Sequence, residues 1–230
     1  MSYKFELISF DLDDTLWPCA PTIIKAETAL YEWLSEHVPQ ITRRYDMQAL
    51  REKRQALLYD HPELSHDLTA LRLQSFIELS EEFNISSDWK QSAFTVFYEA
   101  RQQVELFDDV KPVLDELVNS FRLVSLTNGN ASTVKTGIDH WFEFSLNSIE
   151  VGKSKSEPDI YLKVLEEANI RAQDMVHIGD DPLHDIVGAK SVGASAIWLN
   201  RNGKSWQNDD FQPDATISSL RELPEVLKDI

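Results

Sequence analysis

The sequence predicts an α/β fold in which a parallel sheet has helices on both faces and is interrupted by an inserted helical domain. In the second half of the chain, short apolar runs of strand length alternate with segments of helical periodicity, which is typical of a parallel sheet. Between about residues 22 and 104, every periodic stretch is helical. Polar residues also gather at the ends of the expected strands, where α/β sheets bind their ligands.

The first strand is expected at residues 5–9, an apolar run that leads directly into an acidic loop. Asp11, Asp13 and Asp14 place three carboxylates within four residues at the end of this strand. Like charges at such short spacing repel, which favours a bound cation or a shifted pKa. Taken alone, these residues are also compatible with an acidic turn that has no chemical role.

The inserted helical domain is expected at residues 18–107, with short junctions near residues 17–21 and 106–112. Apolar and aromatic residues recur there at helical spacing in four stretches. Such stripes are typical of the core of a helical bundle rather than of a cofactor pocket. The sheet domain is then expected to comprise residues 1–17 and 108–230.

Strands and helices are expected to alternate after the inserted domain. The expected strands are residues 123–126, 142–146, 175–178 and 194–199. The apolar stripes of the expected helices lie at residues 113–118, 160–168, 186–189 and 220–227. Because strands joined by helical crossovers run parallel, these segments predict one parallel sheet.

The composition argues against several classes of partner. The 230 residues include 39 acidic and 22 basic ones, which gives a formal net charge of −17. Nucleic acids and anionic membranes are bound by clustered Lys and Arg, so neither is expected as a partner. The single cysteine, Cys19, excludes an internal disulfide and argues against a zinc site. With neither a secretory leader nor a run of about 20 apolar residues, a cytoplasmic protein is expected.

Polar residues follow four of the expected strands, and a parallel sheet would bring them to one edge. In order along the chain, these groups are Asp11 to Thr15, Thr127 and Asn128, Lys153 and Lys155, and Asp180, Asp181 and Asp185. A single group has an ordinary structural explanation, such as a turn at residues 127–129 or a helix cap at residues 179–181. The coincidence of all four groups favours an active site.

Phosphoryl transfer is the chemistry that these residue types suit. Asp11 can act as the nucleophile that forms an aspartyl-phosphate, and Asp13 can protonate the leaving alcohol and later take a proton from water. Oxygen ligands favour Mg²⁺ over zinc, and they would come from Asp11, Asp180 and the backbone carbonyl of Asp13. Thr127, Asn128 and a lysine would stabilise the phosphoryl oxygens.

The four groups resemble, in sequence order, the motifs of the haloacid dehalogenase-like hydrolase superfamily. The matching stretches are Asp11-Leu12-Asp13-Asp14-Thr15, Thr127-Asn128-Gly129, Lys155 and Gly179-Asp180-Asp181-Pro182-Leu183-His184-Asp185. The resemblance extends over the whole chain and implies a Rossmann-like core, a mobile helical cap, Mg²⁺ dependence and an aspartyl nucleophile. By position, it also implies that Lys155 orients nucleophile and phosphate, and that Asp181 and Asp185 support the metal ligands from outside its coordination sphere.

The lysine motif departs from the family pattern, in which a proline commonly follows the lysine. Here Ser156 follows Lys155, and Lys153 lies two residues earlier. Lys155 is preferred because residues 157–161 then suit the start of a helix with proline in its first turn. Lys153 remains the alternative.

Three other functions, one of them non-catalytic, are alternatives to a phosphatase. The 2-haloacid dehalogenases resemble this fold and cap but typically lack an acid at the position of Asp13, since halide leaves without a proton or a metal. Asp13 and Asp180 therefore favour hydrolysis of a phosphate ester. Phosphohexomutases share these motifs and remain an alternative. A non-catalytic interaction module is disfavoured by the complete set of reactive groups.

The cap stretch at residues 61–72, together with residues 127–131, resembles bacterial phosphatases of the riboflavin pathway. Those enzymes hydrolyse 5-amino-6-(5-phospho-D-ribitylamino)uracil and also accept FMN and sugar phosphates. The resemblance implies a small phosphorylated metabolite as partner, faced by Trp17, His66 and Arg72. The structural alternatives for these three are hinge packing, a helix start and a surface ion pair. A monomer or a weak homodimer is expected.

Overall fold

The protein consists of two compact units, which the computed structural model describes over residues 4–230. The sheet unit comprises the described chain up to Pro18 together with Glu105–Ile230, and the cap unit comprises Cys19–Val104. The sequence placed these boundaries at residues 17/18 and 107/108. In the described chain, no helix combines the length and the apolar character needed to cross a membrane.

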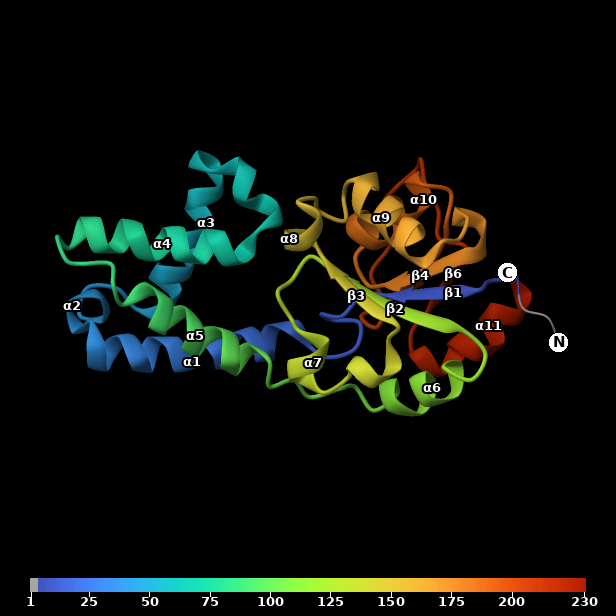
Figure 1. Ribbon diagram of the computed structural model, residues 1–230, viewed down its shortest axis with the longest axis horizontal. Coiled ribbons are helices and arrows are strands. Elements are labelled where there is room, and N and C mark those ends of the chain that lie inside the picture. Colours follow the sequence, from blue (N-terminus) through green and yellow to red (C-terminus); the bar gives the residue numbers. More distant parts are fainter. Residues whose placement is uncertain (1–3) are drawn as a thin grey trace. The chain divides into compact units, whose positions relative to one another are not determined.

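The sheet unit is built on six parallel strands in the order β3-β2-β1-β4-β5-β6 (Figure 1). Its strands are β1 (Leu7–Phe10), β2 (Arg122–Thr127), β3 (Phe144–Asn147), β4 (Met175–Gly179), β5 (Ser195–Leu199) and β6 (Ala215–Ile217). The central strand β1 pairs with β2 on one side and with β4 on the other. The predicted α/β class with a parallel sheet is therefore confirmed.

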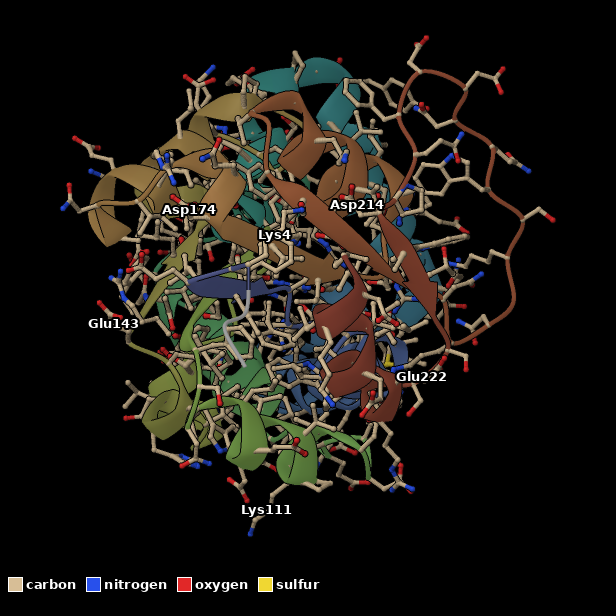
Figure 2. The ribbon with its side chains drawn as sticks, turned by 90° about the vertical axis from the view of Figure 1, so that its right-hand side faces the viewer. Lys4, Lys111, Glu143, Asp174, Asp214 and Glu222 are labelled. Atoms are coloured by element: carbon tan, nitrogen blue, oxygen red, sulfur yellow. The ribbon has the colours of Figure 1, made fainter. Side chains whose placement is uncertain are left out.

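Helices cover both faces of this sheet, with α9 and α10 on one face and α6 and α11 on the other (Figure 1). The helices of the sheet unit are α6 (Val110–Leu117), α7 (Thr133–Thr136), η2 (Asp139–Trp141), α8 (Ser148–Val151), α9 (Pro158–Ala168), η3 (Ala172–Asp174), η4 (Pro182–Val187), α10 (Gly188–Ser191), η5 (Leu220–Glu222) and α11 (Leu223–Asp229). Every residue of β1 and β4 is buried, as expected for strands covered on both faces. Figure 2 shows charged side chains such as Lys111, Glu143 and Glu222 projecting outward from this unit.

The cap unit is entirely helical. It contains α1 (Cys19–His37), α2 (Pro39–Thr42), α3 (Met47–Asp60), η1 (Pro62–His66), α4 (Leu68–Glu82) and α5 (Lys90–Arg101). Residues from α1, α2, α4 and α5 form its own hydrophobic core, with Leu30, Phe76 and Phe97 among the buried side chains. Its aromatic stripes are therefore core, as their periodicity predicted.

Several elements of the sheet unit differ from the sequence expectation, among them β6 and the helix after β4. Strand β6 was not expected, because its three residues are too few to show a strand pattern. The helix after β4 was expected at residues 186–189, but a turn of π-helix begins at Pro182 and continues into α10. Single π-helical turns are rare and gather at functional sites, so this one directs attention to the residues it carries.

Candidate active site

Asp11 follows β1 at the carboxyl edge of the sheet and is buried. Its backbone N–H donates to the carbonyl of Ile178 at 2.9 Å, which continues the pairing of β1 with β4 past the end of the strand. Its Oδ2 accepts a hydrogen bond from the Thr15 hydroxyl at 3.0 Å. Leu16 N–H bonds back to the Leu12 carbonyl at 2.8 Å, so a tight turn holds the acidic loop. Asp11 is thus fixed through its backbone and its side chain.

Lys155 lies in this site and bridges two carboxylates. Its buried ammonium donates to Oδ1 of Asp11 and, at 2.6 Å, to Oδ1 of Asp185. Burial alone lowers the pKa of Lys155, but the charges of Asp11 and Asp185 outweigh it and raise the pKa above its ordinary value. Lys153 instead pairs with Glu157 at 2.7 Å, and its side chain is 45% exposed. The structure therefore brings Lys155, not Lys153, to Asp11.

Asp11, Asp180 and Asp185 form the acidic centre of the site, because one carboxylate oxygen of each lies within 4.8 Å of the others. Burial, followed by the charges of Asp185 and Asp14, raises the pKa of Asp180 to about 7. Burial also raises the pKa of Asp11, and the Asp185 charge adds to this against the opposing effect of Lys155. Both shifts come first from burial and then from neighbouring carboxylates, and a bound cation would oppose both effects.

Asp185 is the most completely enclosed of these acids. Its Oδ2 accepts from the backbone N–H of Asp181 at 2.9 Å, and His177 Nε2 lies 3.1 Å from its Oδ1. A Cβ on Gly179 would lie only 2.2 Å from the Asp185 Cγ, so only glycine leaves space for this carboxylate. The neighbouring Asp181 caps the π-helical turn, since its Oδ1 accepts from Leu183 N–H and His184 N–H.

The phosphate-binding residues expected after β2 also reach this edge. Thr127 is buried at the end of β2, and its hydroxyl oxygen accepts from Gly129 N–H at 2.9 Å. Asn128 Oδ1 accepts from the backbone N–H of Lys155 at 2.8 Å, and its carbonyl accepts from the Ser148 hydroxyl. Asn128 thus positions the lysine segment.

Asp13 is half-buried, and its carboxylate is not part of the acidic centre found among the described residues. Its Oδ1 accepts from the indole N–H of Trp17 at 2.8 Å. Trp17 has no exposed surface, so the structure gives this indole a partner within the acidic loop itself.

The other two residues expected to face substrate belong to the cap unit. His66 is half-buried at the end of η1. Arg72 is buried in α4, where its guanidinium lies 3.4 Å from the ring centre of Phe97 and 3.6 Å from Glu27. Burial, and then the charge of Arg54, lowers the pKa of Arg72 to about 9. Arg51 and Arg54 bond the same glutamate at 2.7 and 2.6 Å, so Arg72 belongs to an enclosed charged cluster rather than to a surface ion pair.

His177 is a site residue that the sequence did not reveal. It lies in β4, fully buried, with Nδ1 3.0 Å from the Ser9 hydroxyl and Nε2 facing Asp185. Burial lowers the pKa of His177, which favours a neutral ring in which one nitrogen donates. The only available signal was one polar residue within an otherwise apolar strand.

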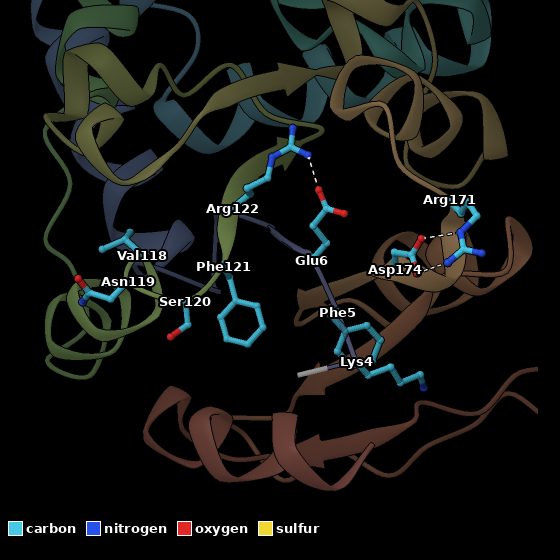
Figure 3. Close-up of a pocket in the computed structure, with 10 residues that line it drawn as sticks. All are labelled: Lys4, Phe5, Glu6, Val118, Asn119, Ser120, Phe121, Arg122, Arg171 and Asp174. Atoms are coloured by element: carbon cyan, nitrogen blue, oxygen red, sulfur yellow. Dashed lines mark hydrogen bonds and ion pairs between the residues drawn. The ribbon is translucent and has the colours of Figure 1, made fainter. Parts of the chain in front are cut away.

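Two cavities of the sheet unit mark its opposite edges. A cavity of about 210 Å³ is lined by Asp14, Asp180, Asn200, Arg201 and Lys204, and so adjoins the acidic centre. A cavity of about 760 Å³ lies beside the amino ends of β1 and β2, and Figure 3 shows its lining. Four of its charged residues form the pairs Arg122–Glu6 and Arg171–Asp174, and Lys4 lies over the Phe5 ring. The larger cavity therefore carries no comparable reactive group among the residues shown.

Comparison with known proteins connects this geometry to a family. A family model described as a haloacid dehalogenase-like hydrolase matches residues 5–193. The chain is 29% identical over 231 residues to the 5-amino-6-(5-phospho-D-ribitylamino)uracil phosphatase YigB of Escherichia coli strain K12, with 97% of each chain covered. It is 27% identical over 244 residues to the N-acylneuraminate-9-phosphatase of Mus musculus, covering 99% of this chain and 95% of the relative.

One of the similar solved structures is described as a dehalogenase rather than as a phosphatase. A structure described as the 2-haloacid dehalogenase from Pseudomonas syringae pv. Tomato DC3000 is 40% identical to this chain. It superposes with a TM-score of 0.89, and the match covers 97% of this chain and 98% of the other.

Proposed function

Because the chain belongs to the haloacid dehalogenase-like hydrolase family, we propose that it is a Mg²⁺-dependent phosphatase of small phosphomonoesters. The observation that carries the proposal is the charge balance of the site. The ammonium of Lys155 bridges Asp11 and Asp185, and Asp180 lies beside them. Fully ionised, these four groups carry two net negative charges, which match one divalent cation.

The donor set suits Mg²⁺ in particular, because it consists of oxygen atoms. Asp11 and Asp180 would hold the ion together with the backbone carbonyl of Asp13, and Asp185 would support them through Lys155. When bound, the ion supplies positive charge that draws an anionic phosphate to an anionic nucleophile.

Each side chain of the site then has its own role in the two steps of the reaction. The Asp11 carboxylate attacks phosphorus, and the bond from phosphorus to the leaving oxygen breaks as Asp13 gives that oxygen a proton. Lys155, Thr127 and Asn128 stabilise the charge on the phosphoryl oxygens. Water next attacks the phosphorus of the aspartyl-phosphate, giving a proton to Asp13, and the bond to Asp11 breaks.

A 2-haloacid dehalogenase is the second candidate, and the description of the 40%-identical structure favours it. In that reaction, Asp11 would displace halide from carbon. Halide is a stable anion that needs no proton, so Asp13 would have no task there. The negative charge of Asp180 and Asp185 would also oppose binding of a haloacid carboxylate. In the phosphatase mechanism, Asp13, Asp180 and Asp185 each have a chemical role, and we favour this function for that reason.

The 29%-identical relative suggests 5-amino-6-(5-phospho-D-ribitylamino)uracil as substrate, hence a cytoplasmic role in riboflavin biosynthesis. FMN and sugar phosphates are the other substrates that we propose. A panel of these compounds, a pyrimidine nucleotide, N-acylneuraminate 9-phosphate and 2-chloropropionate separates the possibilities in one assay.

The decisive experiment measures phosphate and halide release with Mg²⁺ and with EDTA, in the wild type and in Asp11→Asn. We expect phosphate release that EDTA abolishes and that the variant lowers by ~10³-fold or more. Metal-independent chloride release from 2-chloropropionate would favour the dehalogenase. Phosphatase activity that survives both EDTA and the substitution would contradict the proposed mechanism.

A further inference from the structure

Trp17 and Asp13 are joined twice within the acidic loop. The indole Nε1–H of Trp17 donates to Oδ1 of Asp13 at 2.8 Å, and the indole is completely buried. The backbone adds a bridge between the same two residues, and the N–H of Asp14 donates to the Trp17 carbonyl at 2.7 Å. The loop therefore folds Trp17 back onto Asp13 before α1 begins.

Asp11, two residues before Asp13 in the same loop, is held by other groups. Asp11 is held by Thr15 and Lys155, and its carboxylate belongs to the acidic centre. In the described chain, the Asp13 carboxylate lies outside that centre, although only one residue separates the two acids. A carboxylate so close to a bound cation would be drawn to it unless another interaction fixed its direction. The indole N–H supplies such an interaction.

We propose that Trp17 is a positioning residue that keeps the Asp13 carboxylate directed at the leaving group and away from the metal ligands. This proposal rests on the proposed phosphatase function. Because the indole is a donor only, it fixes Oδ1 as an acceptor, and in this proposal Oδ2 carries the transferred proton. That proton moves from Oδ2 to the ester oxygen as its bond to phosphorus breaks, and Oδ2 takes a proton from water in the second step.

The test uses leaving groups that differ in their need for a proton. Trp17→Phe keeps a buried aromatic ring and removes the N–H. With an alkyl phosphate, we expect kcat/KM to fall by about 10²-fold, the usual size of a general-acid effect. With 4-nitrophenyl phosphate, whose leaving group is weakly basic, we expect a change of less than about 3-fold, because proton transfer contributes little. kcat/KM is the suitable quantity because it reports the step in which the leaving group departs.

Two further variants complete the experiment. Trp206→Phe is the matched control, because the Trp206 indole N–H bonds the backbone carbonyls of Asn208 and Phe211, and it should leave both rates unchanged. In an Asp13→Asn background, Trp17→Phe should cause no further loss with the alkyl phosphate, since the indole acts through Asp13.

The outcomes separate this proposal from the function on which it rests. Equal losses on both substrates, or losses that add to those of Asp13→Asn, would overturn the positioning role and assign Trp17 to packing alone. Wild-type protein without Mg²⁺-dependent phosphate release would refute the proposed function instead. Thermal unfolding of each variant identifies any that fails to fold, and the comparison between substrates within one folded variant remains valid.

Discussion

Two lysines two positions apart have opposite environments. Lys155 is buried and bridges Asp11 and Asp185, whereas Lys153 forms an ion pair with Glu157 in which both side chains are more than 40% exposed. Spacing alone could not separate them, because both follow β3 in an irregular segment. The difference comes from the hydrogen bond between Asn128 and the Lys155 backbone, which joins residues far apart in sequence.

The two lysines give a matched pair of substitutions. Lys155→Met should remove most phosphatase activity and destabilise the protein by about 3–5 kcal/mol, because it leaves buried carboxylates without their partner. Lys153→Met should change stability by less than about 1 kcal/mol, since exposed ion pairs contribute little. Urea unfolding and kcat measure both effects. A larger loss for Lys153→Met would contradict the assignment.

Gly179 provides a second prediction at the scale of one residue. In Gly179→Ala, the new Cβ would lie 2.2 Å from the Asp185 Cγ, so Asp185 must move away from Lys155. We expect a loss of about 1–3 kcal/mol and a large fall in kcat. Gly137→Ala is the control, because its φ of 78° strains any other residue while nothing lies within 4 Å of the added atom. It should lose stability but keep its kcat, and equal kcat values for the two variants would disprove the role of Gly179.

At the scale of elements, Asp109 connects three parts of the sheet unit. It precedes α6, accepts from Arg201 after β5 at 2.8 and 2.9 Å, and accepts from the N–H of Leu220 at the start of η5. Burial raises the pKa of Asp109, but the bonds from Arg201, Ser219 and Leu220 outweigh it and lower the pKa below its ordinary value. Ionised Asp109 therefore stabilises the fold above about pH 4, and this contribution is lost as the pH falls through the lowered pKa.

Asp109→Asn tests this connection. The variant should be less stable than the wild type by about 1–3 kcal/mol at pH 7, and the difference should shrink as the pH is lowered below about 4. Asp108→Asn is the control, because the Asp108 side chain is 93% exposed and should show neither effect. The measurement is urea unfolding at a series of pH values. A stability difference that does not change with pH would contradict the proposed role of the charge.

Much of the fold and of the candidate site was predictable, for reasons visible in particular elements. Fully buried strands such as β1 and β4 produce continuous apolar runs, and the polar residues after them mark the carboxyl edge. The family resemblance inferred from those residues is confirmed by the family model. Strand β6 was missed because its three residues carry no pattern. The π-helical turn was missed because it carries Asp185, whose bond to Lys155 joins residues far apart in sequence. His177 was missed because its partners come from other segments.

At the scale of the whole molecule, the net charge of −17 opposes the approach of an anionic phosphate. Raising KCl from about 20 to about 200 mM at constant free Mg²⁺ should therefore increase kcat/KM by about 2- to 3-fold and leave kcat unchanged, since salt screens the approach but not the enclosed site. Steady-state kinetics at several salt concentrations measure this effect. A fall in kcat/KM would mean that local cations such as Arg201 and Lys204 dominate the approach.

The opposite edges of the sheet also decide how this protein can be attached to a surface. Lys4 lines the large cavity at the amino edge (Figure 3). The acidic centre lies at the carboxyl edge. The strands separate these edges by their own length, ~13 Å for a strand of four residues such as β1. A linker anchored at the amino edge would therefore hold the sheet unit on the side away from its reactive edge. Because all strands of the sheet run in the same direction, attachment at one edge sets the direction of the reactive edge when the protein is immobilised, for example in a sensor.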